Sequence, residues 1–317
     1  MIRKFSYFIT GGAGFIGSNI IEFLIKQKVK KITVIDNLSF GKIKFIKKFI
    51  KNKRIKFIKG SILNKNKINK CIRKHDVIIH LSANADIASG NLKPKIDFNQ
   101  TVRGTFNILE AMRINNIKKI IFLSGSGVYG DYGNKLVKEN YTLFPGSIYG
   151  ASKLCAESLI SSYVTNFLFS SFVLRPANIV GKYLTHGVVF DFIKKLKKNK
   201  NLLRVLGDGN QTKPYIIIDD IINAIKLLIN KQKFRPKKLE IYNISNKDRI
   251  KVKDIANLTI KFMNLKKTKI IYGKTKYGWI GDIPQYKLNT KKLEKIGWKN
   301  LYNSSTAIKK SIISNFN

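Results

Sequence analysis

The residues with the clearest chemical potential are Tyr149 and Lys153, which lie four positions apart in the segment Tyr-Gly-Ala-Ser-Lys. On a helix this spacing places both side chains on one face, with about 5–6 Å between their Cβ atoms. A tyrosine has an ordinary pKa near ~10, and a neighbouring ammonium group lowers it by favouring the anion. The pair is therefore typical of a base that takes the proton of an alcohol while a redox cofactor takes its hydride.

A glycine-rich turn predicts that cofactor. Gly11, Gly14 and Gly17 follow an apolar run and open a segment of helical periodicity. The glycines permit a tight turn and close approach of the backbone, and the helix N-terminus binds a pyrophosphate. Asp36 stands about 20 residues further on, where a carboxylate binds both ribose hydroxyls and repels a 2′-phosphate, so NAD is favoured over NADP.

The elements that must position these residues alternate along the first half of the chain. Nearly continuous apolar runs predict buried strands, and apolar residues at helical spacing predict helices between them. The predicted strands are residues 5–10, 31–36, 55–59, 76–81, 119–124 and 171–175, and the predicted helices are 16–27, 101–115 and 149–165. In the second half we expect helices at 187–199, 219–231, 252–264 and 290–297 and a strand at 239–244.

This order predicts an α/β fold, a Rossmann doubly wound parallel sheet with a smaller, interleaved C-terminal α/β lobe that binds the substrate. We expect an NAD-binding domain at residues 1–176 and a mainly substrate-binding lobe at residues 177–317. Hydrophobic residues make up 44% of the 317, which is sufficient for an extended core.

The charge is unusual, with 61 Lys and Arg against 18 Asp and Glu and a formal net charge of +43. Only nine of the basic residues are arginine, the lysines are spread along the whole chain, and Ile and Asn are also abundant. Surfaces that read nucleic acid usually favour arginine. We therefore interpret the lysine excess as compositional bias that favours an anionic substrate, and we expect no specific nucleic-acid partner.

Other site classes are disfavoured. Two cysteines far apart and three scattered histidines form no metal-ligand pattern, so no metal is expected. No apolar stretch approaches the ~20 residues of a membrane span, and the start of the chain reads as a first strand and not as a signal peptide. The sequence predicts a cytoplasmic protein without a membrane partner.

The ordered motifs resemble the extended short-chain dehydrogenase/reductase family, in particular its nucleotide-sugar epimerases and dehydratases, and the resemblance covers almost the whole chain. The motifs are residues 10–17, 36–38, 80–83, 104–105, 109–111, 128–130, 149–153, 175–178, 207–211 and 281–282, with Asn99 and Asp219.

The resemblance implies a role for each matched residue. Tyr149 would be the base, and Lys153 would polarise it and bind the nicotinamide ribose. The cofactor would contact Gly11, Gly14, Phe15, Ile16, Gly17, Asp36, Asn37, Leu81, Ser82, Ala83, Asn99, Tyr149 and Lys153. The nucleotide-sugar substrate would contact Asn178, Gln211, Lys213 and Arg204. A homodimer would form through the helices at 101–115 and 149–165.

This chain departs from the family pattern at several positions. Gly125 replaces the usual catalytic Ser or Thr, and either Ser124 or Ser126 could supply the hydroxyl, with Ser126 preferred. The Thr-Asp-Glu of dehydratases is absent from the same loop. Two other family residues are also replaced, an acidic one near the adenine by Ser61 and a phosphate-binding arginine by Trp279. Arg204 or Lys213 could compensate for that arginine.

The leading hypothesis is an NAD-dependent 4-epimerase of a UDP-hexose. Tyr149 removes the proton of the 4-hydroxyl while NAD takes the hydride from C4, the 4-keto sugar turns, and hydride returns to the other face. Another sugar-nucleotide enzyme, such as a 4-ketoreductase or a uronate decarboxylase, remains the alternative. A non-catalytic protein that binds NAD or nucleic acid is the hypothesis from a different class.

Overall fold

The computed structural model describes residues 1–279 and 281–316, except for the side chains of residues 88 and 89. Its centre is a seven-stranded sheet in the order β12-β7-β5-β4-β1-β2-β3, and every neighbouring pair is parallel. The strands are β1 Ser6–Thr10, β2 Lys31–Asp36, β3 Ile55–Lys59, β4 Val77–His80, β5 Lys119–Leu123, β7 Ser170–Pro176 and β12 Lys238–Ile244. The order reverses between β1 and β4, which is where such sheets bind their ligands.

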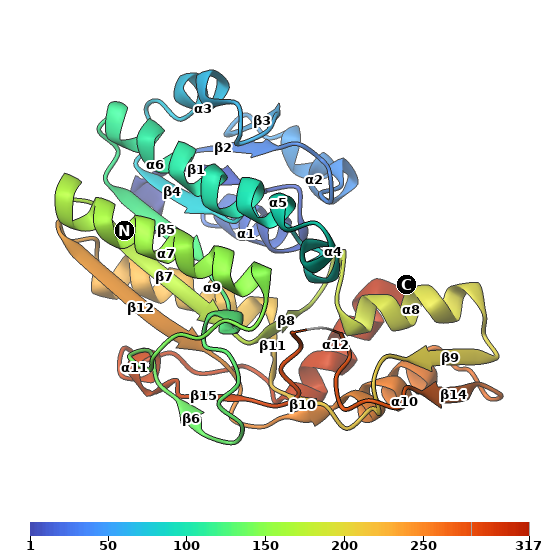
Figure 1. Cartoon of the computed structure of the whole chain (residues 1–317). Helices are drawn as coiled ribbons and strands as arrows, with labels where there is room; N and C mark the ends of the chain where they lie inside the picture. The colour runs from blue at the N-terminus through green and yellow to red at the C-terminus, as the bar shows by residue number, and fades with distance from the viewer. Residues whose placement is uncertain (280, 317) are drawn as a thin grey trace.

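Helices cover both faces of the sheet (Figure 1). The first-half helices are α1 Phe15–Lys26, α2 Ile43–Ile50, α3 Lys65–Cys71, α4 Ile87–Leu92, α5 Pro94–Asp97, α6 Gly104–Ile114 and α7 Ile148–Phe167. Because strand side chains alternate, Tyr7 and Ile9 of β1 join the core under α1, whereas Phe8 joins the core under α6 and α7. The predicted Rossmann fold is confirmed.

The second lobe consists of short elements around the carboxyl end of the sheet (Figure 1). Its strands are β8 Asn178–Val180, β9 Leu202–Val205, β10 Thr212–Lys213, β11 Tyr215–Ile217, β13 Ile250–Lys251, β14 Lys269–Tyr272 and β15 Lys287–Leu288, which pairs with β6 Leu136–Val137. Its helices are α8 Val188–Lys198, α10 Val252–Phe262, α11 Lys291–Glu294 and α12 Ser304–Phe316.

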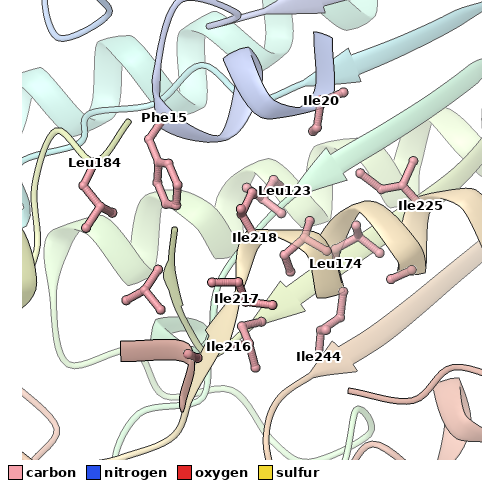
Figure 2. Packing of buried hydrophobic residues seen from close by; sticks show 14 of the residues in the cluster. Phe15, Ile20, Leu123, Leu174, Leu184, Ile216, Ile217, Ile218, Ile225 and Ile244 are labelled. Atoms are coloured by element: carbon pink, nitrogen blue, oxygen red, sulfur yellow. The ribbon is translucent and has the colours of Figure 1, made fainter. Parts of the chain in front are cut away.

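The two halves of the chain share one core. After the second lobe has begun, α9 (Ile218–Leu227) packs beside α1, and β12 completes the central sheet. Figure 2 shows Phe15 and Leu123 of the first half packed with Ile217 and Ile244 of the second. This continuous packing holds the second lobe in a fixed position over the sheet, while the division at residue 176 stays a prediction.

Several elements differ from the predicted ones. The helix expected from residue 101 is preceded by a π-helical turn, Phe98–Arg103, before α6 begins. The helices α2, α3, α4, α5 and α12 and the strands of two to four residues in the second lobe were not predicted. Most of these elements carry too few residues to show a period in the sequence, but length does not explain the missed α12, which has 13 residues.

Candidate active site

The glycine turn forms an open cradle between β1 and α1. Gly11 has a φ of +69°, a conformation that glycine adopts without strain. A Cβ on Gly17 would lie 2.5 Å from the carbonyl oxygen of Gly11, so the helix packs on the turn only with glycine there. Gly14 caps α1 without a side-chain hydrogen bond, which leaves the helix N-terminus available to a phosphate group.

The end of β4 is fixed beside this turn by a buried histidine. The ring of His80 lies 2.6 Å from Thr10 Oγ1 and 3.0 Å from Thr105 Oγ1. Complete burial lowers the pKa of His80 to about 3, so the ring is neutral and acts as a structural link. Thr10 Oγ1 in turn accepts hydrogen bonds from the backbone N–H groups of Leu81 and Ser82.

Asp36 anchors the other end of the cradle. Its Oδ2 accepts a hydrogen bond from Ala13 N at 2.9 Å, and its Oδ1 accepts one from Leu38 N at 2.8 Å. Burial raises the pKa of Asp36, and these two N–H groups oppose the rise by favouring the anion. The carboxylate is therefore held at the place where the sequence predicts the adenosine ribose.

One cavity joins these groups and has a lining suited to the adenosine and pyrophosphate end of a dinucleotide. It brings together ten of the predicted cofactor residues: Gly11, Gly14, Phe15, Ile16, Gly17, Asp36, Asn37, Leu81, Ser82 and Ala83. Asn99 does not line it and Gln100 does, because the unexpected π-helical turn changes which side chain faces the cavity. Ser61 also lines the cavity, as do Thr185 and His186, which sequence reasoning missed.

Tyr149 and Lys153 lie on the first turns of α7, whose N-cap Ser147 accepts a hydrogen bond from Gly150 N at 3.1 Å. Lys153 Nζ lies 5.7 Å from the centre of the Tyr149 ring and donates to the carbonyl oxygen of Leu123 at 2.7 Å. The predicted pairing on one helix face is thus present in the structure.

The electrostatics of the pair differ from the sequence expectation. Burial raises the pKa of Tyr149 to about 12, and the nearby Asp97 carboxylate adds to the rise. Burial also lowers the pKa of Lys153 to about 8, against the opposing effect of Glu157 and Asp97. In the protein alone the pKa of Tyr149 is therefore raised and not lowered, with desolvation as the largest cause. The predicted lowering also depends on the charge of the nicotinamide ring and stays a prediction.

The two candidate serines have different surroundings. Ser124 and Ser126 both line the cavity that contains Tyr149. Ser124 is buried and its hydroxyl donates to Glu157. Ser126 lies beside Tyr286, whose Oη accepts a hydrogen bond from Asn178 Nδ2 at 3.1 Å. Sequence reasoning missed Tyr286, although it stands four residues after the matched Asp282.

Gly125 lies between these serines and faces the base. A Cβ built on it would lie 4.0 Å from Tyr149 Oη, with no described atom nearer. The backbone there is extended, with a φ of −175°, which any residue adopts. Position 125 is therefore where a hydroxyl side chain would reach the base, and this chain has none there.

A buried network holds α7 against the sheet behind these residues. Arg175 of β7 is 2% exposed and pairs with Glu157 at 2.6 Å, one helical turn beyond Lys153. Arg175 Nη1 also donates to Tyr129 Oη, which donates to Asn243 Oδ1 at 2.7 Å. The network links α7, β7 and β12, and so fixes the helix that carries the catalytic pair.

A further cavity extends from the catalytic pocket into the second lobe. It brings together the predicted substrate residues Asn178, Gln211 and Lys213, and Lys213 forms an ion pair with Asp282. Arg204 does not line this cavity and is exposed on β9 between the buried Leu203 and Val205, so its contact with the substrate stays a prediction. Lys195 of α8 lines the cavity instead, and its Nζ donates to the carbonyl oxygen of Arg204.

No group of three or more His, Cys, Asp or Glu side chains suited to a metal is found within the described residues. Nor does that part of the chain contain a helix that is both long and apolar enough to cross a membrane.

Comparisons with known proteins agree with this geometry. The sequence model described as the NAD dependent epimerase/dehydratase family matches residues 7–245. A putative UDP-glucose 4-epimerase of Methanocaldococcus jannaschii is 33% identical over 299 residues, 92% of each chain. A UDP-N-acetyl-α-D-glucosaminuronate decarboxylase of Bacillus cytotoxicus is 31% identical over 258 residues, 78% of this chain and 77% of the relative.

Among solved structures, the UDP-glucuronic acid 4-epimerase of Bacillus cereus, in complex with UDP-glucuronic acid and NAD, superposes with a TM-score of 0.88. It is 25% identical, and the alignment covers 98% of each chain.

Proposed function

The chain belongs to the NAD-dependent epimerase/dehydratase family, and from this premise we propose that it is a nucleotide-sugar 4-epimerase that acts on a UDP-hexose. NAD is its cofactor, held by the cradle of Gly11, Gly14 and Gly17 and by Asp36. When bound, NAD supplies the hydride acceptor and a positive ring charge.

The observation that carries the proposal is the composition of the catalytic cavity. Among the described residues that line it, Asp282 is the only carboxylate, and it is paired with Lys213. Loss of water from a 4-keto sugar needs a further acid and base beside the tyrosine. Epimerisation needs none, because the same proton leaves and returns at the 4-hydroxyl.

The residues of the cavity can perform this proton transfer. Tyr149 in its phenolate form accepts the proton of the 4-hydroxyl and returns it after the sugar has turned. Because burial holds the pKa of Tyr149 high in the protein alone, the anion forms only when positive charge is added beside it. Lys153 already stands beside Tyr149 in the protein alone, so the ring of the bound cofactor would supply the added charge.

Space for turning the sugar is available next to Tyr149. A Cβ on Gly125 would meet no described atom closer than 4.0 Å, and one on Gly127 none closer than 3.8 Å. The hydroxyls of Ser126 and Tyr286 stand on the same wall and offer hydrogen bonds to the sugar.

The proposal is tested by incubating the purified protein with UDP-glucose, UDP-galactose and their N-acetyl and uronate relatives and identifying the products. We expect interconversion of one 4-epimeric pair without net consumption of cofactor. Production of carbon dioxide, or of a 4-keto-6-deoxy sugar, would contradict the epimerase. Steady oxidation of added NADPH would identify a ketoreductase.

Restoring a hydroxyl at position 125 is expected to increase activity. We predict that Gly125→Ser raises kcat about tenfold, because one hydrogen bond to the reacting oxygens contributes about 1.4 kcal/mol. Gly127→Ser is the matched control: its Cβ would lie 4.0 Å from Tyr149 Cδ1 and not beside the phenol oxygen. An unchanged or lower kcat in folded, NAD-loaded Gly125→Ser would contradict the role assigned to this position.

We propose that the protein forms a homodimer through α6 and α7. These helices lie side by side (Figure 1) and expose apolar side chains, with Phe106 39%, Ile114 59% and Phe167 37% exposed. Ile114→Lys combined with Phe106→Glu is expected to halve the mass measured by light scattering to one chain of 36.2 kDa. Leu301→Lys, an exposed leucine outside these helices, is the control. A monomeric wild-type protein at micromolar concentration would contradict the proposal.

A further inference from the structure

His186 lies where the three cavities of the active site meet. It precedes Gly187, the N-cap of α8, on the loop that leaves β8. Within the described part of the chain it is the one residue that lines the cofactor, catalytic and substrate cavities alike. Its Nδ1 lies 3.0 Å from Thr185 Oγ1 and therefore has a polar neighbour. Its Nε2 is the nitrogen available to a ligand.

The walls on both sides of His186 suit anions. On the cofactor side, Phe15 and Ile16 belong to the first turn of α1, and they line a cavity together with His186. On the substrate side, Gly187 and Val188 form the start of α8, which also has no side-chain cap. A helix N-terminus attracts a phosphate group. If the proposed function holds, each ligand carries a diphosphate, so the histidine stands between two anions.

The side chains of the substrate cavity do not supply net positive charge by themselves. Its charged lining consists of Lys195 and Lys213 against Asp191 and Asp282, and Lys213 is already paired with Asp282. Formal charges therefore cancel there, despite the net charge of +43 on the whole chain. In the cofactor cavity, Asp36 is the charged residue of the described lining.

We propose, on the basis of the proposed function, that His186 is a shared contact for the diphosphates of cofactor and substrate and binds a proton when the second diphosphate arrives. The imidazolium then donates hydrogen bonds to phosphate oxygens and neutralises part of the added negative charge. A neutral imidazole between two diphosphates would leave that charge uncompensated in a narrow cleft.

The surroundings of the His186 ring determine whether substrate affinity rises or falls with pH. Desolvation by the surrounding protein lowers the pKa of His186 although the residue is partly open to solvent, and Asp86 opposes this lowering. Two diphosphates raise the pKa again, because nearby anions favour the charged form. Affinity for the substrate is therefore greatest at low pH and is lost as pH rises through the pKa of the bound state. The other charged groups that face the junction are Asp36, Asp191, Asp282, Lys195 and Lys213.

The test measures proton uptake without turnover. UDP-glucose and UDP-galactose are titrated calorimetrically into full-length, NAD-loaded protein that carries Tyr149→Phe, in two buffers of different ionisation enthalpy near pH ~7. The diphosphate of a nucleotide sugar has no ionisable proton in this range, so uptake reports the protein. We expect about one proton bound per nucleotide sugar, because the pKa of a histidine lies near ~6.5 and shifts readily across neutral pH.

Three variants distinguish His186 from its surroundings. In His186→Gln we expect no uptake and about tenfold weaker binding near pH ~6, with a difference from the parent that disappears near pH ~9. In His186→Arg we expect the affinity that the parent has at low pH to persist at every pH, with no uptake, because arginine stays charged. Lys195→Gln should weaken binding with uptake unchanged, because His186 is still present.

The outcomes separate this inference from the function on which it rests. Binding without proton uptake, or uptake that persists in His186→Gln, would overturn the role of His186 and leave the epimerase standing. If neither nucleotide sugar binds, the UDP-hexose proposal is contradicted, and this inference with it.

Discussion

Tyr149→Phe is expected to lower kcat for epimerisation by about 10²–10⁴-fold, the contribution of a positioned acid or base. The change removes only the phenol oxygen, and the ring continues to pack between α7 and the cavity wall. Initial rates measured by chromatographic separation of the two UDP-hexoses provide the test. NAD content, measured after denaturation, should equal that of the wild type, because the cradle and Asp36 are untouched.

Tyr132→Phe is the matched control for this change. The hydroxyl of Tyr132 donates to the carbonyl oxygen of Thr142, and the residue lines none of the three active-site cavities. Its kcat should stay within about twofold of the wild type, as for substitutions away from the site. If Tyr149→Phe keeps wild-type kcat, Tyr149 is not the base.

Lys153→Met is expected to lower kcat by about 10²-fold, with part of the loss appearing as weaker NAD retention. Methionine retains the length and apolar stem of the buried side chain but removes its charge. Without that charge the phenolate form of Tyr149 is less favoured, so its pKa is expected to rise and the phenolate fraction to fall. Steady-state kinetics at saturating NAD separate this effect from loss of cofactor.

Folding should survive the Lys153 change. The carbonyl oxygen of Leu123 loses its 2.7 Å hydrogen bond, which costs about 1–3 kcal/mol. Removal of a buried ammonium whose pKa is lowered to about 8 offsets part of that cost. Thermal melts of Lys153→Met and of Lys118→Met, a half-buried lysine whose Nζ donates to the carbonyl oxygen of Phe167, provide the comparison. A folded Lys153→Met protein with wild-type kcat would contradict the charge argument.

The features that could be predicted from the sequence are those set by local geometry. A strand, a glycine turn and a helix place the pyrophosphate site, and a spacing of four on one helix places Tyr149 and Lys153 together. The parallel sheet follows from the alternation of apolar runs and helical periods. Each of these depends on neighbours within about 20 residues.

The features that the sequence did not show depend on contacts between distant segments. Tyr286 and Ser126 line one cavity, as do His186 and Phe15, because the second lobe lies over the carboxyl end of the sheet. Arg204 is a candidate only as a substitute for the arginine that Trp279 replaces, and the alternation along β9 that exposes it was not predicted.

The environment of the serines and of the base also required the structure. Ser124 and Ser126 are equivalent by position, and the buried Glu157 distinguishes them by accepting the hydroxyl of Ser124. The raised pKa of Tyr149 arises first from burial, a property of the assembled cavity. Asp97 contributes as well, because α5, which precedes Tyr149 by about 50 residues in the sequence, packs against α7 in the structure.

The central claim, transient oxidation at C4 with return to the same carbon, is tested most directly with UDP-glucose that carries deuterium at C4. The product is isolated and the position of the label is determined by nuclear magnetic resonance. An epimerase returns the deuterium to C4, so UDP-galactose should retain the label there without exchange with solvent. Deuterium found at C6 of a deoxy sugar, or a product that has lost the label, would contradict the proposed reaction.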